Sequence, residues 1–136
     1  MRFATSFALA AVLALAGCAT HREKDQLQKV LDSYAATVRW GDFQAAYAFV
    51  DPKQREAHPL TELDRARYQQ VRVSDYDVQS TVPQGEHEVR QVVRIGLINN
   101  NTQSERSVID TQVWRYDEKK KQWWLESGLP DITRLD

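Results

Sequence analysis

The chain is poor in cysteine and glycine, and these shortages exclude several kinds of site. Its 136 residues include one cysteine, Cys18, and five glycines. A single cysteine excludes an intramolecular disulfide and a metal cluster held by several thiolates. Five glycines leave little material for phosphate-cradling loops, and the sequence contains neither such a loop nor a Ser-His-Asp signature. We therefore expect no metal ion and no cofactor.

The chain also lacks an excess of charge of either sign. It has 18 Lys and Arg against 19 Asp and Glu, which gives a formal net charge of −1. Nucleic-acid-binding domains usually carry a basic surface, so we expect no nucleic acid among the partners. Hydrophobic residues make up 42% of the chain and aromatic residues 10%, more than a disordered protein contains. The composition therefore predicts a folded domain with its own core.

No hydrophobic run is long enough to span a membrane, but a shorter one lies near the N-terminus. Arg2 precedes residues 3–15, which are mostly Ala, Leu, Phe and Val, and small residues follow them. The length of this run and its flanks are typical of a secretory signal peptide rather than of a spanning helix.

The tetrad Leu15-Ala16-Gly17-Cys18, at the end of that run, closely resembles the lipobox of bacterial lipoproteins. The resemblance implies a signal peptide of residues 1–17, cleavage before Cys18, and acyl chains on this cysteine. Two or more acyl chains hold a protein stably in a membrane, so the implied anchoring is permanent. Ala19 stands where an Asp would retain such a lipoprotein in the inner membrane, which implies the outer membrane and a domain facing the periplasm. The alternative is an ordinary buried cysteine in an N-terminal helix.

Cleavage before Cys18 would leave 136 − 17 = 119 residues, enough for one domain. Residues 18–25 are polar and aperiodic, which predicts a short lipidated tether of about 20 Å at full extension. Residues 26–136 are predicted to form the single domain. A helix is predicted from about Glu23 to Arg39, because apolar residues recur there at helical spacing. They are Leu27, Val30, Leu31, Tyr34 and Val38.

Short helices and then strands are predicted for the rest of the chain. After Gly41, three helices are expected: residues 43–50, Pro52 to His58, and Thr61 to about residue 68. Their expected start signals are Asp42, Asp51-Pro52, and a capping box of Thr61 with Asp64. Alternating apolar residues predict strands near 71–82, 89–97, 108–116 and 123–127. This order indicates an α+β fold in which N-terminal helices cover an antiparallel sheet of about four strands.

Several short motifs along this order resemble the NTF2-like superfamily, also called SnoaL-like or cystatin-like cones. They are Trp40-Gly41-Asp42-Phe43, Ala45-Ala46-Tyr47, Asp51-Pro52, and the late tryptophans Trp114, Trp123 and Trp124. The resemblance implies a curved sheet, a cone-shaped cavity between sheet and helices, and homodimers formed through the outer face of the sheet. Members include dehydratases, isomerases, small-ligand binders and interaction modules, so the fold does not decide the function.

Two residues are weak candidates for catalysis, Asp110 and His58. Asp110 lies on a predicted strand between apolar neighbours, where a buried carboxyl can act as a general base. Arg94, on the preceding strand, is expected roughly opposite it, and the alternative is a structural Arg–Asp pair on the outer face of the sheet. His58 is expected at a helix end near the cavity mouth, and the alternative for all three histidines is simple exposure.

Aromatic side chains with polar tips are the candidates for a ligand pocket. The residues are Tyr34, Trp40, Tyr47, Tyr76 and Trp114, together with Arg94. The alternative is that they form an ordinary core and a dimer interface.

Three consecutive lysines, Lys119–Lys121, also have two interpretations. They either touch anionic lipid headgroups or form a solvated hairpin tip.

These observations favour a non-catalytic, outer-membrane-anchored periplasmic lipoprotein that binds a small apolar ligand or a periplasmic protein. The first alternative is a membrane-tethered lyase or isomerase that uses the cone cavity. The second is a structural dimeric module in envelope assembly.

Overall fold

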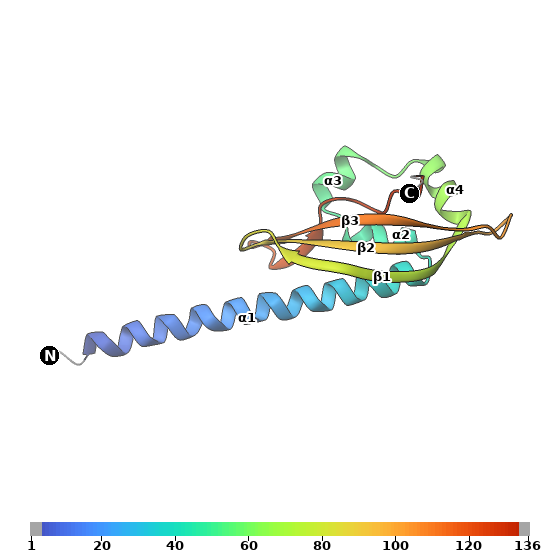
Figure 1. Ribbon diagram of the computed structural model, residues 1–136. Coiled ribbons are helices and arrows are strands. Elements are labelled where there is room, and N and C mark those ends of the chain that lie inside the picture. The colour runs from blue at the N-terminus through green and yellow to red at the C-terminus, as the bar shows by residue number, and fades with distance from the viewer. Residues whose placement is uncertain (1–3, 134–136) are drawn as a thin grey trace.

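The computed structural model describes residues 4–133, with side chains from residue 20 onward. Residues 1–3, at the start of the predicted signal peptide, and residues 134–136, at the end of the predicted domain, lie outside the described residues. The side chain of Cys18 also lies outside them. The elements are α1 (Ala4–Arg39), α2 (Phe43–Ala46), a 3-10 turn (Tyr47–Phe49), α3 (Pro52–Ala57), α4 (Glu62–Gln69), β1 (Val71–Pro83), β2 (Glu88–Asn99), β3 (Glu105–Asp117) and β4 (Gln122–Leu125). Helices precede strands, so the predicted α+β order is confirmed (Figure 1).

The four strands form one antiparallel sheet in the order β1-β2-β3-β4. Each strand pairs with the next along the chain, as short hairpins require. The pairing of β1 with β2 shifts register between Val73 and Asp75 and again between Val78 and Ser80. Such irregularities bend and twist a strand, and Figure 1 shows β1 bowed along its length where it lies above α1.

Local capping signals explain where the short helices begin. Gly41 has a φ of +73°, which few residues other than glycine adopt, and it follows the end of α1. Asp42 accepts a hydrogen bond from the amide of Ala45, and Asp51 accepts one from the amide of Lys53. Thr61 and Asp64 form a reciprocal capping box at the start of α4. All these start signals were predicted, and they are confirmed.

The second helix is shorter than predicted. It tightens into the 3-10 turn after Ala46, and Val50 then forms a parallel bridge with Leu125. The amide of Asp51 also donates to the carbonyl of Leu125 at 2.9 Å. A helix continuing to Val50 would lose this contact with β4, so the long-range pairing ends the helix early.

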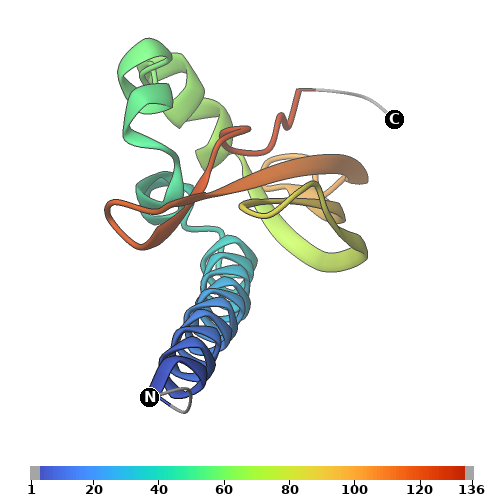
Figure 2. The ribbon, with the colours of Figure 1, turned by 90° about the vertical axis from the view of Figure 1, so that its left-hand side faces the viewer.

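The core lies between α1 and the inner face of the sheet. Alternate residues of β2 and β3 point toward α1, which contributes the fully buried Tyr34 and Val38. The largest fully buried side chains are Trp114, Tyr34, Ile95, Leu97, Leu125 and Gln112. Figure 2 looks along α1 and shows the green helices α3 and α4 gathered on one side of the molecule and the β1–β2 hairpin on the other.

Helix α1 runs through the segment predicted as an irregular tether. Residues 18–25 are helical, so they span about 12 Å rather than about 20 Å. Helix-forming residues and the (i, i+4) pair of His21 with Asp25, 3.6 Å apart, favour this conformation despite the missing apolar stripe. Figure 1 shows the N-terminal half of α1 projecting beyond the sheet. Within the described residues, no helix has the length and apolar run needed to cross a membrane.

Candidate functional site

A group of polar side chains is buried in the core beneath α1. β3 turns Asp110, Gln112 and Trp114 inward, because alternate residues of a strand share a face. β1 adds Tyr76 and α1 adds Tyr34. We call these five residues the Asp110 cluster. Asp110 is only 8% exposed, and Gln112, Tyr34 and Trp114 are fully buried.

The amide of Gln112 organises the cluster. Its Nε2 donates to Asp110 Oδ2 at 2.9 Å and to the Tyr76 hydroxyl at 3.0 Å. Its Oε1 accepts from Trp114 Nε1 at 3.0 Å. An indole N–H can only donate, so this bond fixes the orientation of the amide. Gln112 thereby has both donors and its acceptor engaged, as a buried amide requires.

Burial shifts the titration of the cluster. It raises the pKa of Asp110 to about 6, and the hydrogen bond from Gln112 offsets part of that rise. Burial also raises the pKa of Tyr76 to about 12 and that of Tyr34 well above its ordinary value. At neutral pH the two phenols are therefore protonated, while Asp110 exchanges its proton near pH 6. A carboxyl that titrates close to neutrality in a buried site is a candidate functional group.

Tyr34 carries the one unsatisfied hydroxyl of the cluster. Its ring packs edge-on against Trp114 and Phe49, with centroids 5.2 and 5.5 Å away. Its hydroxyl is buried and has no hydrogen-bond partner. The charge of Asp110 raises the pKa of Tyr34 further, so the carboxyl and this phenol lie within electrostatic reach.

The predicted pairing of Arg94 with Asp110 is wrong. In the observed register Asp110 stands opposite Val93, and Arg94 stands opposite Ile109. Directly opposed residues share a face, so Arg94 points to the outer side of the sheet. It lies 3.5 Å from Asp77 there and is half-exposed. Alternation along β2 places Arg94 on the face opposite to the buried Val93 and Ile95, so it cannot pair with the inward Asp110.

The other predicted site residues lie apart from the cluster. Trp40 is 89% exposed at the end of α1. Tyr47 is half-buried, and its hydroxyl reaches the backbone carbonyls of Arg55 and His58 at 3.4 and 3.3 Å. The imidazole of His58 is exposed. Of the predicted ligand-binding residues, the structure thus brings together only Tyr34, Tyr76 and Trp114.

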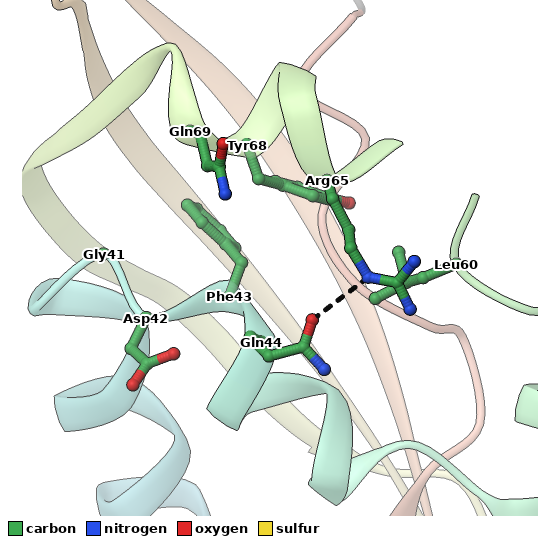
Figure 3. Close-up of a pocket in the computed structure, with 8 residues that line it drawn as sticks. All are labelled: Gly41, Asp42, Phe43, Gln44, Leu60, Arg65, Tyr68 and Gln69. Carbon is green, nitrogen blue, oxygen red and sulfur yellow. Dashed lines mark hydrogen bonds between the residues drawn. The ribbon is translucent and has the colours of Figure 1, made fainter. Parts of the chain in front are cut away.

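A pocket of about 270 Å³ opens between α2 and α4 (Figure 3). We call it the α2–α4 pocket. It is lined by Gly41, Asp42, Phe43, Gln44, Leu60, Arg65, Tyr68 and Gln69. The Phe43 and Tyr68 rings stack at 4.5 Å, and the Nε of Arg65 donates to Gln44 Oε1 at 3.4 Å. The pocket therefore combines an aromatic wall with a cation and two amides at its rim.

Tyr68 connects the α2–α4 pocket to the interior. The Tyr68 hydroxyl donates to the Pro130 carbonyl at 2.8 Å. Tyr68 also lines a second pocket of about 320 Å³, which Tyr47 and His58 line as well. Burial raises the pKa of Tyr68, and the charges of Asp64, Asp131 and Asp110 add to the rise in that order. The phenol is therefore held protonated at the wall of the pocket.

Sequence reasoning missed Gln112, Phe43, Arg65 and Tyr68 as site residues. Gln112 had a usable signal, since it alternates with Asp110 and Trp114 on one strand face. Arg65 had none, because its role depends on how α4 packs beside α2. In the part of the chain that the structure describes, no group of three or more His, Cys, Asp or Glu side chains could hold a metal ion.

Comparison with models of protein families, with curated proteins and with solved structures finds no match for this chain. The geometry of the site therefore carries the functional argument alone.

Proposed function

We propose that this chain is an outer-membrane lipoprotein whose NTF2-like domain binds a small ligand in the α2–α4 pocket and catalyses no reaction. The lipobox-like tetrad supports the anchor, and the α+β order supports the fold. The observation that carries the binding role is the pocket itself, where an aromatic wall faces Arg65, Gln44 and Gln69.

The position of the first domain contacts supports cleavage before Cys18. Glu23 of α1 is joined to the rest of the domain at two points: its carboxylate lies 2.9 Å from His87, just before β2, and its carbonyl accepts from Trp123 Nε1 of β4 at 3.1 Å. Cleavage before Cys18 would remove only the part of α1 that projects beyond the sheet (Figure 1). The remaining chain keeps every one of these contacts and begins next to the membrane.

The size and chemistry of the pocket define the ligand class. About 270 Å³ lies at the lower end of small-molecule sites, which suits a single-ring compound. Phe43 and Tyr68 favour a flat apolar body. The guanidinium of Arg65 is held by Gln44 and by Glu62 at 2.8 Å, and it favours a carboxylate or another acceptor on the ligand. We therefore propose a small aromatic acid.

The positions of the two catalytic candidates argue against the lyase or isomerase alternative. A general base must reach the substrate proton within hydrogen-bond distance. Asp110 lies under α1 and lines neither the α2–α4 pocket nor the one beside it, and the exposed His58 lines only that second pocket. The third hypothesis, a structural dimer, stays a prediction. The outer sheet face carries the charged pair of Arg94 and Asp77 beside the exposed Ile109.

Replacing Cys18 with alanine is expected to abolish lipid labelling and to release the protein from the membrane fraction. The cysteine is the only thiol of the chain, so no second residue can accept a thioether-linked lipid. Labelling with a radioactive fatty acid and fractionation of cells measure the two effects. Trp40→Ala, a change at an exposed site, serves as the control for expression. A Cys18→Ala protein that stays in the membrane pellet as wild type does would contradict the anchor.

Replacing Arg65 with glutamine is expected to weaken binding of benzoate, our probe for an aromatic acid, by about tenfold or more. The loss of a charge-assisted hydrogen bond costs about 1.5–3 kcal/mol, and 1.4 kcal/mol is a factor of ten. Benzoate itself is expected to bind in the millimolar range, which titration followed by NMR can measure.

Arg67→Gln is the matched control for this experiment. Arg67 lies two residues further along α4, is more exposed than Arg65, and does not line the pocket. Equal affinity of the two variants for benzoate, or no shift of Tyr68 signals in wild type, counts against the proposed site.

A further inference from the structure

Three consecutive lysines, Lys119–Lys121, form the tip of the turn between β3 and β4. All three are exposed. The carboxylate of Asp117 accepts from the amides of Lys119 and Lys120 at 3.0 and 3.1 Å, so it builds the turn. Among the described residues, no carboxylate forms an ion pair with the three ammonium groups. The turn therefore presents three cations without a close ion pair, of which Lys120 also acts through its charge on the Asp117 carboxylate.

This lysine turn lies at the end of the domain where α1 leaves the sheet (Figure 1). His87 joins the two elements there. Its Nδ1 lies 2.9 Å from the Glu23 carboxylate on α1, and its Nε2 lies 2.8 Å from the Glu118 carboxylate in the turn. Glu23 follows Cys18 by five residues, about 8 Å along a helix. The lysines thus lie close to the point at which the proposed lipid anchor enters the membrane.

The acidic groups nearest to the lysine turn are already engaged. Glu23 and Glu118 both contact His87, and Glu86 lies 3.9 Å from the same imidazole. The hydrogen bond with Glu23 raises the pKa of His87. These three carboxylates therefore gather at His87 rather than at the lysine side chains.

A cleft of about 480 Å³ adjoins the lysine turn. Its lining includes Lys53, Arg115, Lys119, Lys120 and Trp124, together with the carboxylates of Asp51, Asp117 and Glu118. Asp51 pairs with Arg115 at 2.7 Å, so the lysines supply the free cations of the cleft. The Lys120 ammonium lies 5.9 Å from the ring centre of Trp124, which is half-buried. Tryptophan is enriched at the interface between lipid headgroups and acyl chains, and a lysine beside it can reach the headgroups.

We propose that the lysine turn and its cleft bind the headgroups of anionic phospholipids in the membrane that holds the anchor. The inference rests on the proposed lipoprotein, because the anchor brings this end of the domain to the bilayer. A lysine near an anionic membrane surface gains about 1 kcal/mol, which is about a fivefold change in contact probability. Three lysines, added to a permanent anchor, orient the domain with the lysine turn against the membrane and the α2–α4 pocket accessible.

The test measures how the membrane protects these lysines. The acylated protein is reconstituted into vesicles of phosphatidylcholine alone or of phosphatidylcholine with phosphatidylglycerol, and is treated briefly with an amine-acetylating reagent. Peptide mass spectrometry then gives the acetylation rate at each lysine. We expect Lys119–Lys121 to react about fivefold more slowly in the anionic vesicles, and high salt to remove the difference. Lys29, further along α1, is the internal reference with equal rates in both.

Matched variants separate a headgroup contact from a general effect of charge. Lys119→Gln with Lys121→Gln is expected to remove the protection of Lys120. Arg67→Gln with Arg72→Gln, which deletes the same charge away from the turn, is expected to preserve it. Equal acetylation of the three lysines in both vesicles, with acylated Cys18 confirmed by intact mass, overturns the headgroup contact alone. A protein without acyl chains on Cys18 overturns the proposed lipoprotein and the contact that rests on it.

Discussion

Replacing Trp114 with alanine is expected to destabilise the domain by about 3–5 kcal/mol. The indole is fully buried and packs edge-on against Tyr34, with ring centres 5.2 Å apart. Removing the indole leaves a cavity under α1. Gln112 Oε1 also loses its hydrogen-bond donor, the indole N–H of Trp114. The free energy of unfolding of such domains is about 5–15 kcal/mol, so the variant is expected to lose much of its stability. Urea unfolding followed by circular dichroism measures the change.

Trp40→Ala is the matched control for Trp114→Ala. The same residue type is removed, but Trp40 is 89% exposed, so the expected change lies within about 0.5 kcal/mol. Trp114→Phe keeps most of the ring and deletes only the N–H. It is expected to cost about 1–3 kcal/mol, because an acceptor stays buried without its partner. If Trp114→Ala unfolds at the same urea concentration as Trp40→Ala, the described core is wrong.

Replacing Asp110 with asparagine is expected to stabilise the domain at pH 7 by up to about 3 kcal/mol. The pKa of Asp110 is about 6 in the folded state against an ordinary value of 3.8, and each pKa unit corresponds to about 1.4 kcal/mol. Between these values the folded state binds more protons than the unfolded state. The wild type therefore loses stability as the pH rises from about 4 to 6, and above 6 the loss is complete.

Asparagine removes this dependence, because it carries no charge at any of these pH values. Its side-chain oxygen can still accept from Gln112 Nε2 in place of the Asp110 oxygen. Urea unfolding of both proteins from pH 4 to pH 8 gives the difference in free energy of unfolding, which is expected to grow with pH in favour of the variant. His87 titrates in both proteins, so its contribution cancels in the difference.

Asp77→Asn is the control for the pH experiment. Asp77 is 46% exposed and pairs with Arg94 on the outer face of the sheet. Its replacement is expected to change stability by less than about 1 kcal/mol at every pH. A difference between wild type and Asp110→Asn that does not vary with pH would falsify the buried, proton-exchanging carboxyl.

The sequence by itself determined the elements and their order. Helix starts depend on contacts within three or four residues, so Asp42, Asp51 and Thr61 could be assigned as caps without the fold. The inward face of β2 follows from alternation, a property of a single strand. The lipobox-like tetrad is likewise a local motif, and it remains the basis of the proposed anchor.

Only the tertiary structure decided which side chains meet. The pairing of β2 with β3 set Val93, rather than Arg94, opposite Asp110. The packing of α4 beside α2 created the pocket at Arg65, and the packing of α1 on the sheet placed Glu23 beside His87, which also contacts Glu118 of the lysine turn. These contacts join residues far apart in the chain, where packing and sheet twist act together and local propensity carries no information.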